Sequence, residues 1–584
     1  MSTWNLDALY TGCEDPAFLA DYQKLQQEIV NLESLSSHLT TLNETEGLIQ
    51  IINTQQNLLL VASKLGAYLS LRQTCDTTNQ EISSWLNKFS NLTSETAKSF
   101  ATMSLWIAEV DLTKVDLETP LIKEHLFWIQ EIKKEGAHLL DKETEAAISK
   151  MKLNASNTWE TLREYLTSTL SIEFNNETHT MSSIRNFAYD SDPAIRKAAY
   201  EAELKAYPQI QDSLAFALNS IKGQANVIAE LRGYHDILDM TLSASRMKRS
   251  TLDAMLCAMR ESLPSFHQYF KQKANLLNHT NGLPFYDLFA NIGSCESNFT
   301  IEQSKEYLLK HFTPFSKEVA DITETAYNQE WIDFFPKKGK VGGAFCYNLP
   351  FIKQSRILTN YNHTLSDVVT LAHELGHAYH GYCIEDHSPL NTDYSMPVAE
   401  TASTFNETII MNAAIKDAKT DDEKIFLLES SLQDASQVIV DILSRYIFET
   451  SVINTRKDEF LFPSQLDELM IQAQKEAYGD GLDPNYLHPS MWIVKGHYYS
   501  ADLNFYNFPY AFGLLFAKGL YALYQKEGQS FTDKYHDLLH ATTVSSVEEV
   551  AAIVGIDLSD VNFWRSSLSI ITDSIEEFIQ LTSK

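Results

Sequence analysis

The sequence predicts a mostly α-helical protein, with a small β region beside the helices that carry its reactive side chains. Glycine and proline, which disfavour helix interiors, number only 20 and 15 among 584 residues. Apolar residues recur in steps of three and four at Tyr22, Leu25, Ile29 and Leu32. That spacing is typical of a helix packed lengthwise against another. The same spacing runs through residues 367–380, so helices are expected in both halves of the chain.

The first third of the chain predicts helices that end at a β-hairpin. Residues 170–174 and 177–181 flank an Asn-Asn turn and alternate weakly in polarity. Residues 190–193, Asp-Ser-Asp-Pro, are typical of a helix start. We therefore expect a domain boundary near residue 195, between an N-terminal helical domain, 1–195, and a second domain, 196–584.

The second domain is predicted to be helical apart from one segment. Long helices fill most of 195–330, a short β region covers about 338–362, and helices resume to the C-terminus. Gly342, Gly343 and Ala344 precede the β residues. Glycines there would let another backbone approach closely, as a peptide does when it adds a strand to an open edge. A simple bulge or turn is the alternative.

Composition argues against several partners. The formal net charge is −31 and has no basic stripe, so neither nucleic acid nor an anionic membrane is an expected partner. The longest apolar stretch, 508–524, is interrupted by Lys518 and is too short to span a bilayer. The six cysteines never form a Cys-x-x-Cys pair, and the N-terminus has no pattern of a secretory signal. We expect a soluble, cytoplasmic protein.

Residues 373–377, His-Glu-Leu-Gly-His, carry the most specific chemical signal. Four residues on a helix advance the direction by about 400°, so His373 and His377 project from one face and can share one metal ion. Glu374 lies on the neighbouring flank, where it can polarise a water at the metal without being a ligand. Two imidazoles with a carboxylate suit one zinc ion per chain, although cobalt or manganese could use the same ligands.

A hydrolytic zinc site needs a third protein ligand. The residues Ser-Met-Pro at 395–397 predict a second helix from about Pro397 to Ala414, and Glu400 and Glu407 share one of its faces. We predict that Glu400 binds the metal and that Glu407 orients a ligand through a hydrogen bond. A solvated helix acid is the alternative for Glu407.

His380 follows on the first helix. It lies about 10.5 Å along the axis from His373, whereas ligand atoms must lie about 2 Å from one ion. It is therefore expected to orient a ligand or to face the substrate. A satisfied core histidine is the alternative.

The surroundings of the motif are distinctive as well. His-Glu-Leu-Gly-His-Ala at 373–378 is followed by Met-Pro-Val-Ala-Glu at 396–400. In this respect the chain resembles the oligoendopeptidase F branch of the thimet-oligopeptidase-like zinc peptidases. Further segments that look like this family occur along essentially the whole chain, at 4–10, 232–234, 339–346, 358–362, 497–499 and 505–513.

The resemblance implies a fold and further site residues. It implies two helical lobes around a deep channel that admits flexible oligopeptides and excludes folded proteins. It also implies that His497, Tyr506 and Tyr510 surround the scissile carbonyl, with one tyrosine as the donor to the oxyanion. The thimet branch has a tyrosine where Gly513 stands here, which leaves the donor open between Tyr506 and Tyr510. Core packing is the alternative for each aromatic residue.

The expected function is that of a zinc-dependent endopeptidase acting on short, unstructured oligopeptides. His373, His377 and Glu400 would hold Zn²⁺, and Glu374 would be the general base. The second domain, 196–584, would then be the catalytic zinc metallopeptidase domain. A zinc exopeptidase, either an aminopeptidase or a carboxypeptidase, and a catalytically inert helical binding protein are the alternatives. No oligomeric state follows from the sequence.

Overall fold

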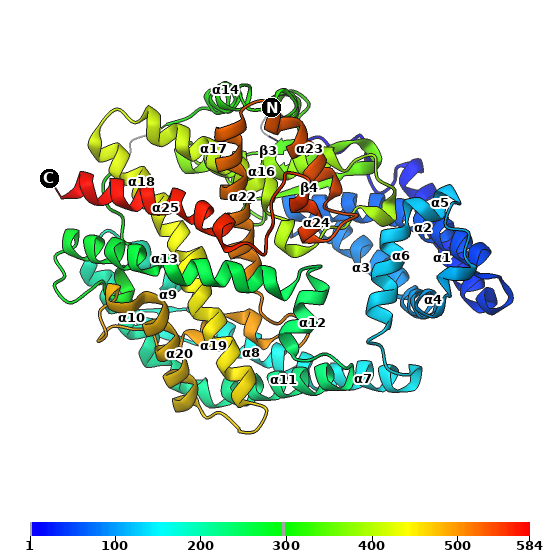
Figure 1. Cartoon of the computed structure of the whole chain (residues 1–584), viewed down its shortest axis with the longest axis horizontal. Coiled ribbons are helices and arrows are strands. Elements are labelled where there is room, and N and C mark those ends of the chain that lie inside the picture. The colour runs from blue at the N-terminus through cyan, green and yellow to red at the C-terminus, as the bar shows by residue number, and fades with distance from the viewer. Residues whose placement is uncertain (1–2, 295–297, 584) are drawn as a thin grey trace.

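The computed structural model describes residues 3–294 and 298–583, and most of these residues lie in helices (Figure 1). The predicted mostly α-helical fold is confirmed. The helices of the first part of the chain are α1 (Pro16–His38), α2 (Glu44–Cys75), α3 (Gln80–Ser94), α4 (Ala97–Glu109), α5 (Pro120–Glu124), α6 (Leu126–Gly136), α7 (Lys142–Asn154) and α8 (Ser156–Thr169).

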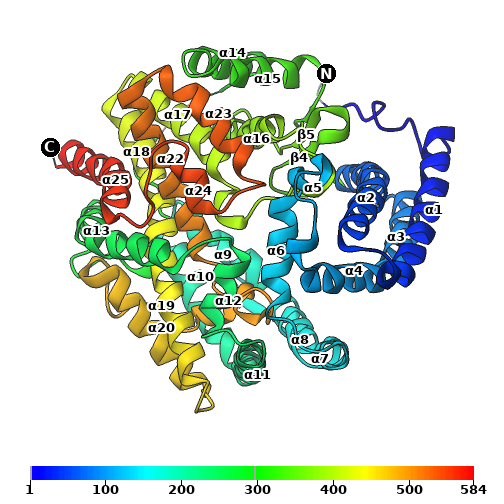
Figure 2. The same ribbon diagram turned by 45° about the vertical axis from the view of Figure 1, so that its right-hand side comes forward.

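The first apolar core is built by the N-terminal helices, which gather on one side of the molecule (Figure 2). Helix α1 begins after Asp15, whose carboxylate accepts a hydrogen bond from the Ala17 amide, and it packs along α2. Leu25, Ile29 and Leu32 are fully or almost fully buried. The apolar stripe predicted from the sequence is therefore the contact face of α1.

The predicted hairpin is present between α8 and the next helices. Strands β1 (Ile172–Phe174) and β2 (Glu177–His179) pair antiparallel. Asn175 and Asn176 join them with φ angles of 52° and 64°, the left-handed values that a tight two-residue hairpin turn requires. Two helices follow, α9 (Met181–Arg185) and α10 (Pro193–Ala206), and α10 starts at the predicted Asp-Pro step. The domain boundary near 195 stays a prediction.

A second, larger apolar core reaches from Leu170 to Phe578. Its helices up to the sheet are α10, α11 (Gln211–Leu231), α12 (Ile237–Ala244), α13 (Arg249–Leu276), α14 (Ile301–Phe312) and α15 (Lys317–Asn328). Those after the sheet are α16 (Leu365–Cys383), α17 (Thr401–Asp417), α18 (Asp421–Ser436), α19 (Ile442–Thr455), α20 (Pro463–Tyr478), α21 (Met491–Val494), α22 (Phe508–Glu527), α23 (Ser530–Ala541), α24 (Val547–Ala552) and α25 (Val561–Thr582). Together they enclose the predicted metal helix, α16.

The predicted β region is a small sheet against α16. Strand β5 (Gln354–Leu358) lies in the middle, parallel to β3 (Ile332–Asp333) and antiparallel to β4 (Phe345–Leu349). Two residues of the sheet, Leu349 and Leu358, also join the first core, so the sheet connects the two cores. Strand β4 is an edge of the sheet, and within the described part of the chain no strand pairs with its outer side.

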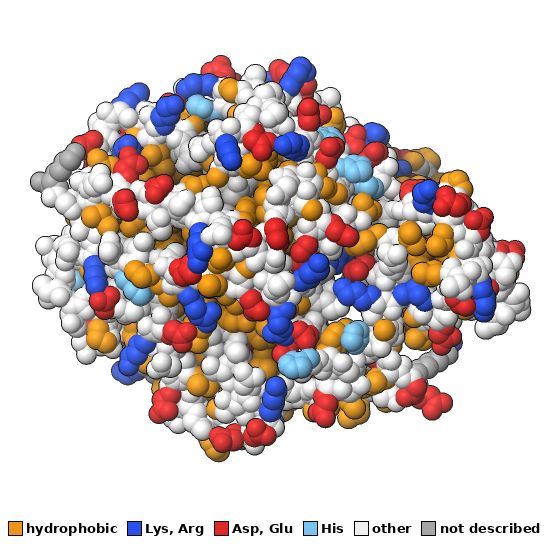
Figure 3. Space-filling view, viewed as in Figure 1, with side chains coloured by type: hydrophobic (Ala, Val, Ile, Leu, Met, Phe, Trp, Pro, Cys, Tyr) orange, Lys and Arg blue, Asp and Glu red, His pale blue; other side chains and the backbone are white. Residues whose placement is uncertain are grey.

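The surface shows acidic and basic side chains interspersed over the face drawn in Figure 3. No helix among residues 3–294 and 298–583 has the length and apolarity needed to cross a membrane. The five described cysteines, Cys13, Cys75, Cys257, Cys346 and Cys383, are free thiols. The sixth, Cys295, lies outside the described residues.

Candidate metal centre

Helix α16 carries the His-Glu-Leu-Gly-His motif. Thr364 caps its N-terminus: the hydroxyl accepts a hydrogen bond from the Asp367 amide, and the Asp367 carboxylate accepts one from the Thr364 amide. The apolar positions predicted from the sequence are buried along one side of this helix. His373 and His377 therefore project together from a helix that is fixed at its start and along its length.

The second metal segment begins differently from the prediction. A 3-10 turn covers Met396–Val398, Glu400 follows at the N-cap position with φ −95° and ψ 8°, and α17 begins only at Thr401. The predicted continuous helix from Pro397 to Ala414 is therefore wrong at its start. Pro397 is compatible with the first turn of a 3-10 helix and with that of an α-helix, because neither turn uses the N–H that proline lacks. The sequence pattern therefore does not specify which of the two turns forms.

Two glycines bring three segments together at Glu400. A Cβ on Gly376 would lie 2.4 Å from the carbonyl oxygen of Ala402, so α16 and α17 meet there backbone to backbone. A Cβ on Gly513 of α22 would lie 3.0 Å from Cβ of Glu400. Sequence reasoning did not assign a packing role to Gly376. Its signal was a glycine inside a strongly apolar helix, where glycine is otherwise unfavourable.

The two imidazoles and the Glu400 carboxylate converge as predicted. Nε2 of His373 and Nε2 of His377 each lie 3.3 Å from the same oxygen, Oε2 of Glu400. One potential ligand atom from each residue lies within 4.8 Å of the others. Ser403 donates a further hydrogen bond of 2.7 Å to that oxygen. Two nitrogens and one oxygen aimed at one point fit a zinc ion with an open fourth position.

Electrostatics favour a cation at this point. Burial acts to raise the pKa of Glu400, but hydrogen bonds from His373 and His377 hold it well below its ordinary value. Burial likewise acts to lower the pKa of His373, yet its contacts with Glu400 and Glu407 raise it to about 10. The carboxylates thus favour positive charge on the His373 ring. A divalent cation at this point would be attracted by the same carboxylates, so the residues fit a metal.

Glu407 occupies the place predicted for an orienting carboxylate. Its Oε2 lies 3.2 Å from Nδ1 of His373, on the side of the ring opposite Glu400. A hydrogen bond at Nδ1 directs Nε2 of the same ring toward the metal point. The role of Glu407 as an orienting residue remains a prediction, but its geometry is that of one.

Glu374 is buried beside the ligands without being one of them. Only 5% of its surface is exposed. Burial raises its pKa above the ordinary value, against the opposing effect of His373 and His377. Its charge also contributes to raising the pKa of the Cys346 thiol on β4. The buried carboxyl group therefore has a raised proton affinity, as a general base requires.

The glycines before β4 are exposed and have free space. A Cβ on Gly342 or Gly343 would meet no atom within 4 Å, and Gly343 has a φ of 79° that favours glycine. The Asn360 side-chain amide donates a hydrogen bond of 2.8 Å to the Gly343 carbonyl and holds the loop. Ala344 leads directly into β4. Another backbone can reach this edge, although its approach stays a prediction.

The three C-terminal aromatic residues are neighbours of one another, and Tyr510 lies beside the metal point. Ring centroids are 5.2 Å apart for Tyr506 and Tyr510 and 6.4 Å apart for His497 and Tyr506. Tyr510 is 41% exposed and lines a cavity of about 370 Å³ together with His373 and Glu400. The structure thus brings Tyr510 to the metal group from a segment more than 100 residues away in sequence, with Tyr506 next to Tyr510 and His497 next to Tyr506.

His497 is largely buried and neutral. Burial, assisted by nearby cations including Arg445, lowers its pKa to about 3. Its Nε2 is buried, and no hydrogen-bond partner for it exists among the described residues. An unpaired polar atom of this kind is costly unless a ligand satisfies it.

His380 is placed in the protein core. It is fully buried, its Nε2 lies 2.8 Å from the Thr542 hydroxyl, and its ring stacks on Tyr394 at 4.3 Å. Burial lowers its pKa to about 3. These contacts match the core-histidine alternative, and it is not one of the residues that meet at the metal point. A role toward the substrate stays a prediction.

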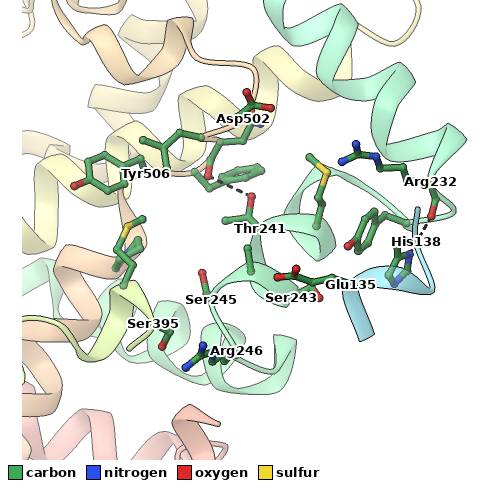
Figure 4. Close-up of a pocket in the computed structure, with 18 of the residues that line it drawn as sticks. Glu135, His138, Arg232, Thr241, Ser243, Ser245, Arg246, Ser395, Asp502 and Tyr506 are labelled. Atoms are coloured by element: carbon green, nitrogen blue, oxygen red, sulfur yellow. Dashed lines mark hydrogen bonds between the residues drawn. The ribbon is translucent and has the colours of Figure 1, made fainter. Parts of the chain in front are cut away.

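A second cavity, of about 480 Å³, opens beside Tyr506 (Figure 4). Glu135 and His138, at the end of α6, lie across it from Asp502 and Tyr506 of the C-terminal segment. Since α6 contributes to the first core and the C-terminal segment to the second, this cavity lies between the two.

Comparison with known proteins places the chain in a family. The family model described as Peptidase family M3 matches residues 186–570. "Oligopeptidase PepF" of Bacillus subtilis is 25% identical over 100% of this chain and 87% of its own length. A solved chain from Chlamydophila abortus superposes with a TM-score of 0.85 at 20% identity, covering 99% of this chain and 98% of its own. Oligoendopeptidase-F of Enterococcus faecium superposes with a TM-score of 0.71 at 20% identity, covering 97% and 99%. The chain therefore belongs to Peptidase family M3, as a metalloendopeptidase of its oligoendopeptidase F branch.

Proposed function

We propose that the chain is a zinc-dependent oligoendopeptidase that hydrolyses internal bonds of short, unstructured peptides. The observation that carries this proposal is the convergence of His373, His377 and Glu400 on one point beside a buried carboxyl, Glu374. These three residues would hold one Zn²⁺ ion. When bound, zinc supplies a Lewis acid and lowers the pKa of water enough to make it a nucleophile near neutral pH.

Glu374 is the proposed general base and acid. Its burial and raised pKa suit a group that takes a proton from the attacking water and returns it to the leaving amine. Glu407 holds His373 through Nδ1, so that the ring keeps its orientation during the reaction. Both carboxyl groups act without binding the metal.

Tyr510 and Tyr506 are the proposed donors to the oxyanion, with His497 as a further donor. Burial raises the pKa of Tyr510, so its hydroxyl keeps its proton and can donate a hydrogen bond. The neutral His497 carries an unsatisfied buried Nε2, which a substrate carbonyl would satisfy. Donors of this kind stabilise the charge that develops on the carbonyl oxygen of the scissile bond.

The substrate is proposed to bind as an added strand on β4. Gly342, Gly343 and Ala344 leave room for its backbone, and β4 has a free outer edge in the described chain. The cavity of about 370 Å³ next to His373 and Glu400 has space for a substrate side chain. Its walls include the apolar side chains of Met411, Leu432 and Leu514 and the charged ones of Asp434 and Lys518. A site placed between helices in this way would form a deep channel that excludes folded proteins.

The proposed catalytic domain is 196–584, and the proposed N-terminal domain is 1–195. Every proposed site residue lies within 196–584, the proposed catalytic domain, and 1–195 would form the other lobe. Residues of α6 line the cavity of about 480 Å³ beside Tyr506, so the N-terminal domain would close one side of the channel.

One experiment tests the proposal directly. The purified enzyme is stripped with a chelator, reloaded with zinc, and given a peptide blocked at both ends, and the first products are identified by mass. Internal cleavage that returns with zinc supports the endopeptidase. Cleavage only of peptides with a free terminus would point instead to an aminopeptidase or carboxypeptidase, which the oligoendopeptidase relatives do not favour. A protein that binds zinc but cleaves nothing would match the inert binding protein.

A further inference from the structure

The loop that carries Tyr506 is held in an unusual backbone conformation. It runs over 500–507, between a 3-10 turn at Gly496–Tyr499 and helix α22. Phe505, directly before Tyr506, has a φ of 54°. A bulky residue rarely adopts this left-handed value, and such strain persists only where the surroundings impose it.

A buried charge pair lies under this loop. Nζ of Lys222, on α11, lies 2.8 Å from Oε1 of Glu449, on α19. Their side chains are 0% and 1% exposed. Lys222 also donates a hydrogen bond of 2.7 Å to the side-chain oxygen of Asn504 in the loop.

Glu449 binds the loop through both of its oxygens. Oε1 accepts a hydrogen bond of 3.0 Å from the amide of the strained residue, Phe505. Oε2 accepts one of 3.0 Å from the side-chain amide of Asn507. The Asn507 side-chain oxygen in turn accepts a bond of 2.6 Å from the Phe508 amide, at the first residue of the helix that carries Tyr510. One carboxylate thus holds the residues on both sides of Tyr506, Phe505 through its backbone amide and Asn507 through its side chain.

The loop is held from its other side as well. The Thr241 hydroxyl of α12 donates a hydrogen bond of 3.2 Å to the Asn504 carbonyl (Figure 4). Both Thr241 and Tyr506 face the cavity of about 480 Å³, so the loop forms a wall of that cavity. The two residues of the charge pair are buried and do not line this cavity.

We propose that Lys222 and Glu449 are positioning residues for peptide hydrolysis, which hold Phe505 in its left-handed conformation and so direct the hydroxyls of Tyr506 and Tyr510. This inference rests on the proposed function, in which a tyrosine donates to the oxyanion. A buried ion pair contributes little net stability compared with apolar residues of the same size. The pair instead makes three hydrogen bonds to the loop. Such contacts orient the loop, because a hydrogen bond constrains a direction as well as a distance.

The chain offers a matched control. Lys273 and Glu429 form another buried Lys–Glu pair, with side chains 0% and 2% exposed. They also form hydrogen bonds with Tyr269, with Gln433 and with the Leu288 carbonyl, none of which belongs to the loop over 500–507. Glu429→Gln therefore perturbs a buried pair of the same kind away from the tyrosines.

The test compares Glu449→Gln with Glu429→Gln in the full-length, zinc-loaded enzyme. All three partners of Glu449 are hydrogen donors, so the amide of glutamine must face one of them. Both variants should lower the thermal midpoint. Only Glu449→Gln should lower kcat, by on the order of 100-fold, with KM changed little, because misplaced donors affect the transition state more than binding. Equal kcat in the two variants would overturn the inference.

A double-mutant comparison separates this inference from the proposed function. If Glu449 acts through the tyrosines, adding Glu449→Gln to Tyr506→Phe/Tyr510→Phe should lower kcat by less than about threefold further. A further large loss would overturn the inference and leave the tyrosine role intact. If Tyr506→Phe/Tyr510→Phe itself kept full kcat, the tyrosines would not be the donors to the oxyanion, and the inference would fail as well.

A second variant covers the case in which Glu449→Gln does not fold. Asn504→Ala keeps the charge pair and removes one of its contacts with the loop. It should lower kcat about tenfold at nearly constant KM. Unchanged kcat in Asn504→Ala would overturn the inference.

Discussion

Replacing Gly376 with alanine is expected to weaken metal binding more than folding. An alanine Cβ would lie 2.4 Å from the Ala402 carbonyl oxygen and 2.5 Å from Cα of Ser403. Ordinary contact begins at 3.4 Å, so the difference from 2.4 Å requires α16 and α17 to separate by about 1 Å. Neither partner is a flexible side-chain end, so the backbones themselves must move.

This separation acts directly on the ligand set. His373 and His377 lie on α16, whereas Glu400 directly precedes α17. Metal sites tolerate ligand distances within about 0.2 Å of their ordinary values, so zinc affinity should fall on the order of 100-fold. Overpacking costs about 1–3 kcal/mol, and alanine is about 1 kcal/mol better than glycine within a helix. The zinc-free protein should therefore lose at most about 2 kcal/mol of unfolding free energy.

Two measurements check this prediction. Zinc affinity is obtained by competition with a chromophoric chelator, and the unfolding free energy of the zinc-free protein by urea denaturation. Gly66→Ala is the control: it lies in α2, where its Cβ would contact only the Phe89 ring, at 3.2 Å, and it should leave zinc affinity unchanged. A Gly376→Ala protein that binds zinc as tightly as the parent would refute the close-packing argument.

Three more predictions concern the carboxyl groups. Glu374→Gln should keep zinc bound, by metal analysis, and lower kcat by about 100- to 10,000-fold, and unchanged turnover would contradict the general-base role. Glu407→Gln should weaken zinc binding about 10- to 100-fold in chelator competition, and unchanged affinity would show that it does not orient His373. Burial acts to raise the pKa of Glu203, but His488 and Arg185 lower it to about 2. Because this pKa is below its ordinary value of 4.5, the stabilisation is present above pH 4.5 and is lost as the pH falls toward 2. Urea denaturation over that range should show a loss of about 3 kcal/mol that Glu203→Gln lacks.

Several features could be predicted because they depend on neighbouring residues. The buried face of α16 and the Asn-Asn hairpin turn each follow from a few consecutive side chains. The start of α17 could not be predicted in the same way. A proline after a serine is compatible with either kind of helical turn, and where the α-helix begins after Pro397 is set beyond those neighbours.

The packing role of Gly376 and the pair of Lys222 with Glu449 were not visible in the sequence. Gly376 matters because of a backbone on another helix, Ala402. Lys222 and Glu449 are 227 residues apart, and each by itself is an ordinary helical charge. Their contacts with the loop depend on how α11, α19 and the loop before α22 pack together.

The sequence by itself determined the reactive helix, its two histidines and its buried glutamate, because the period of the α-helix places these residues on known faces. It also carried the family, through motifs spread along the chain. Only the tertiary structure decided that Glu400 reaches both imidazoles, that His380 is buried in the core, and that Tyr510 lies beside the metal point. The physical reason is that these distances depend on how closely whole helices pack, and local sequence patterns do not specify that.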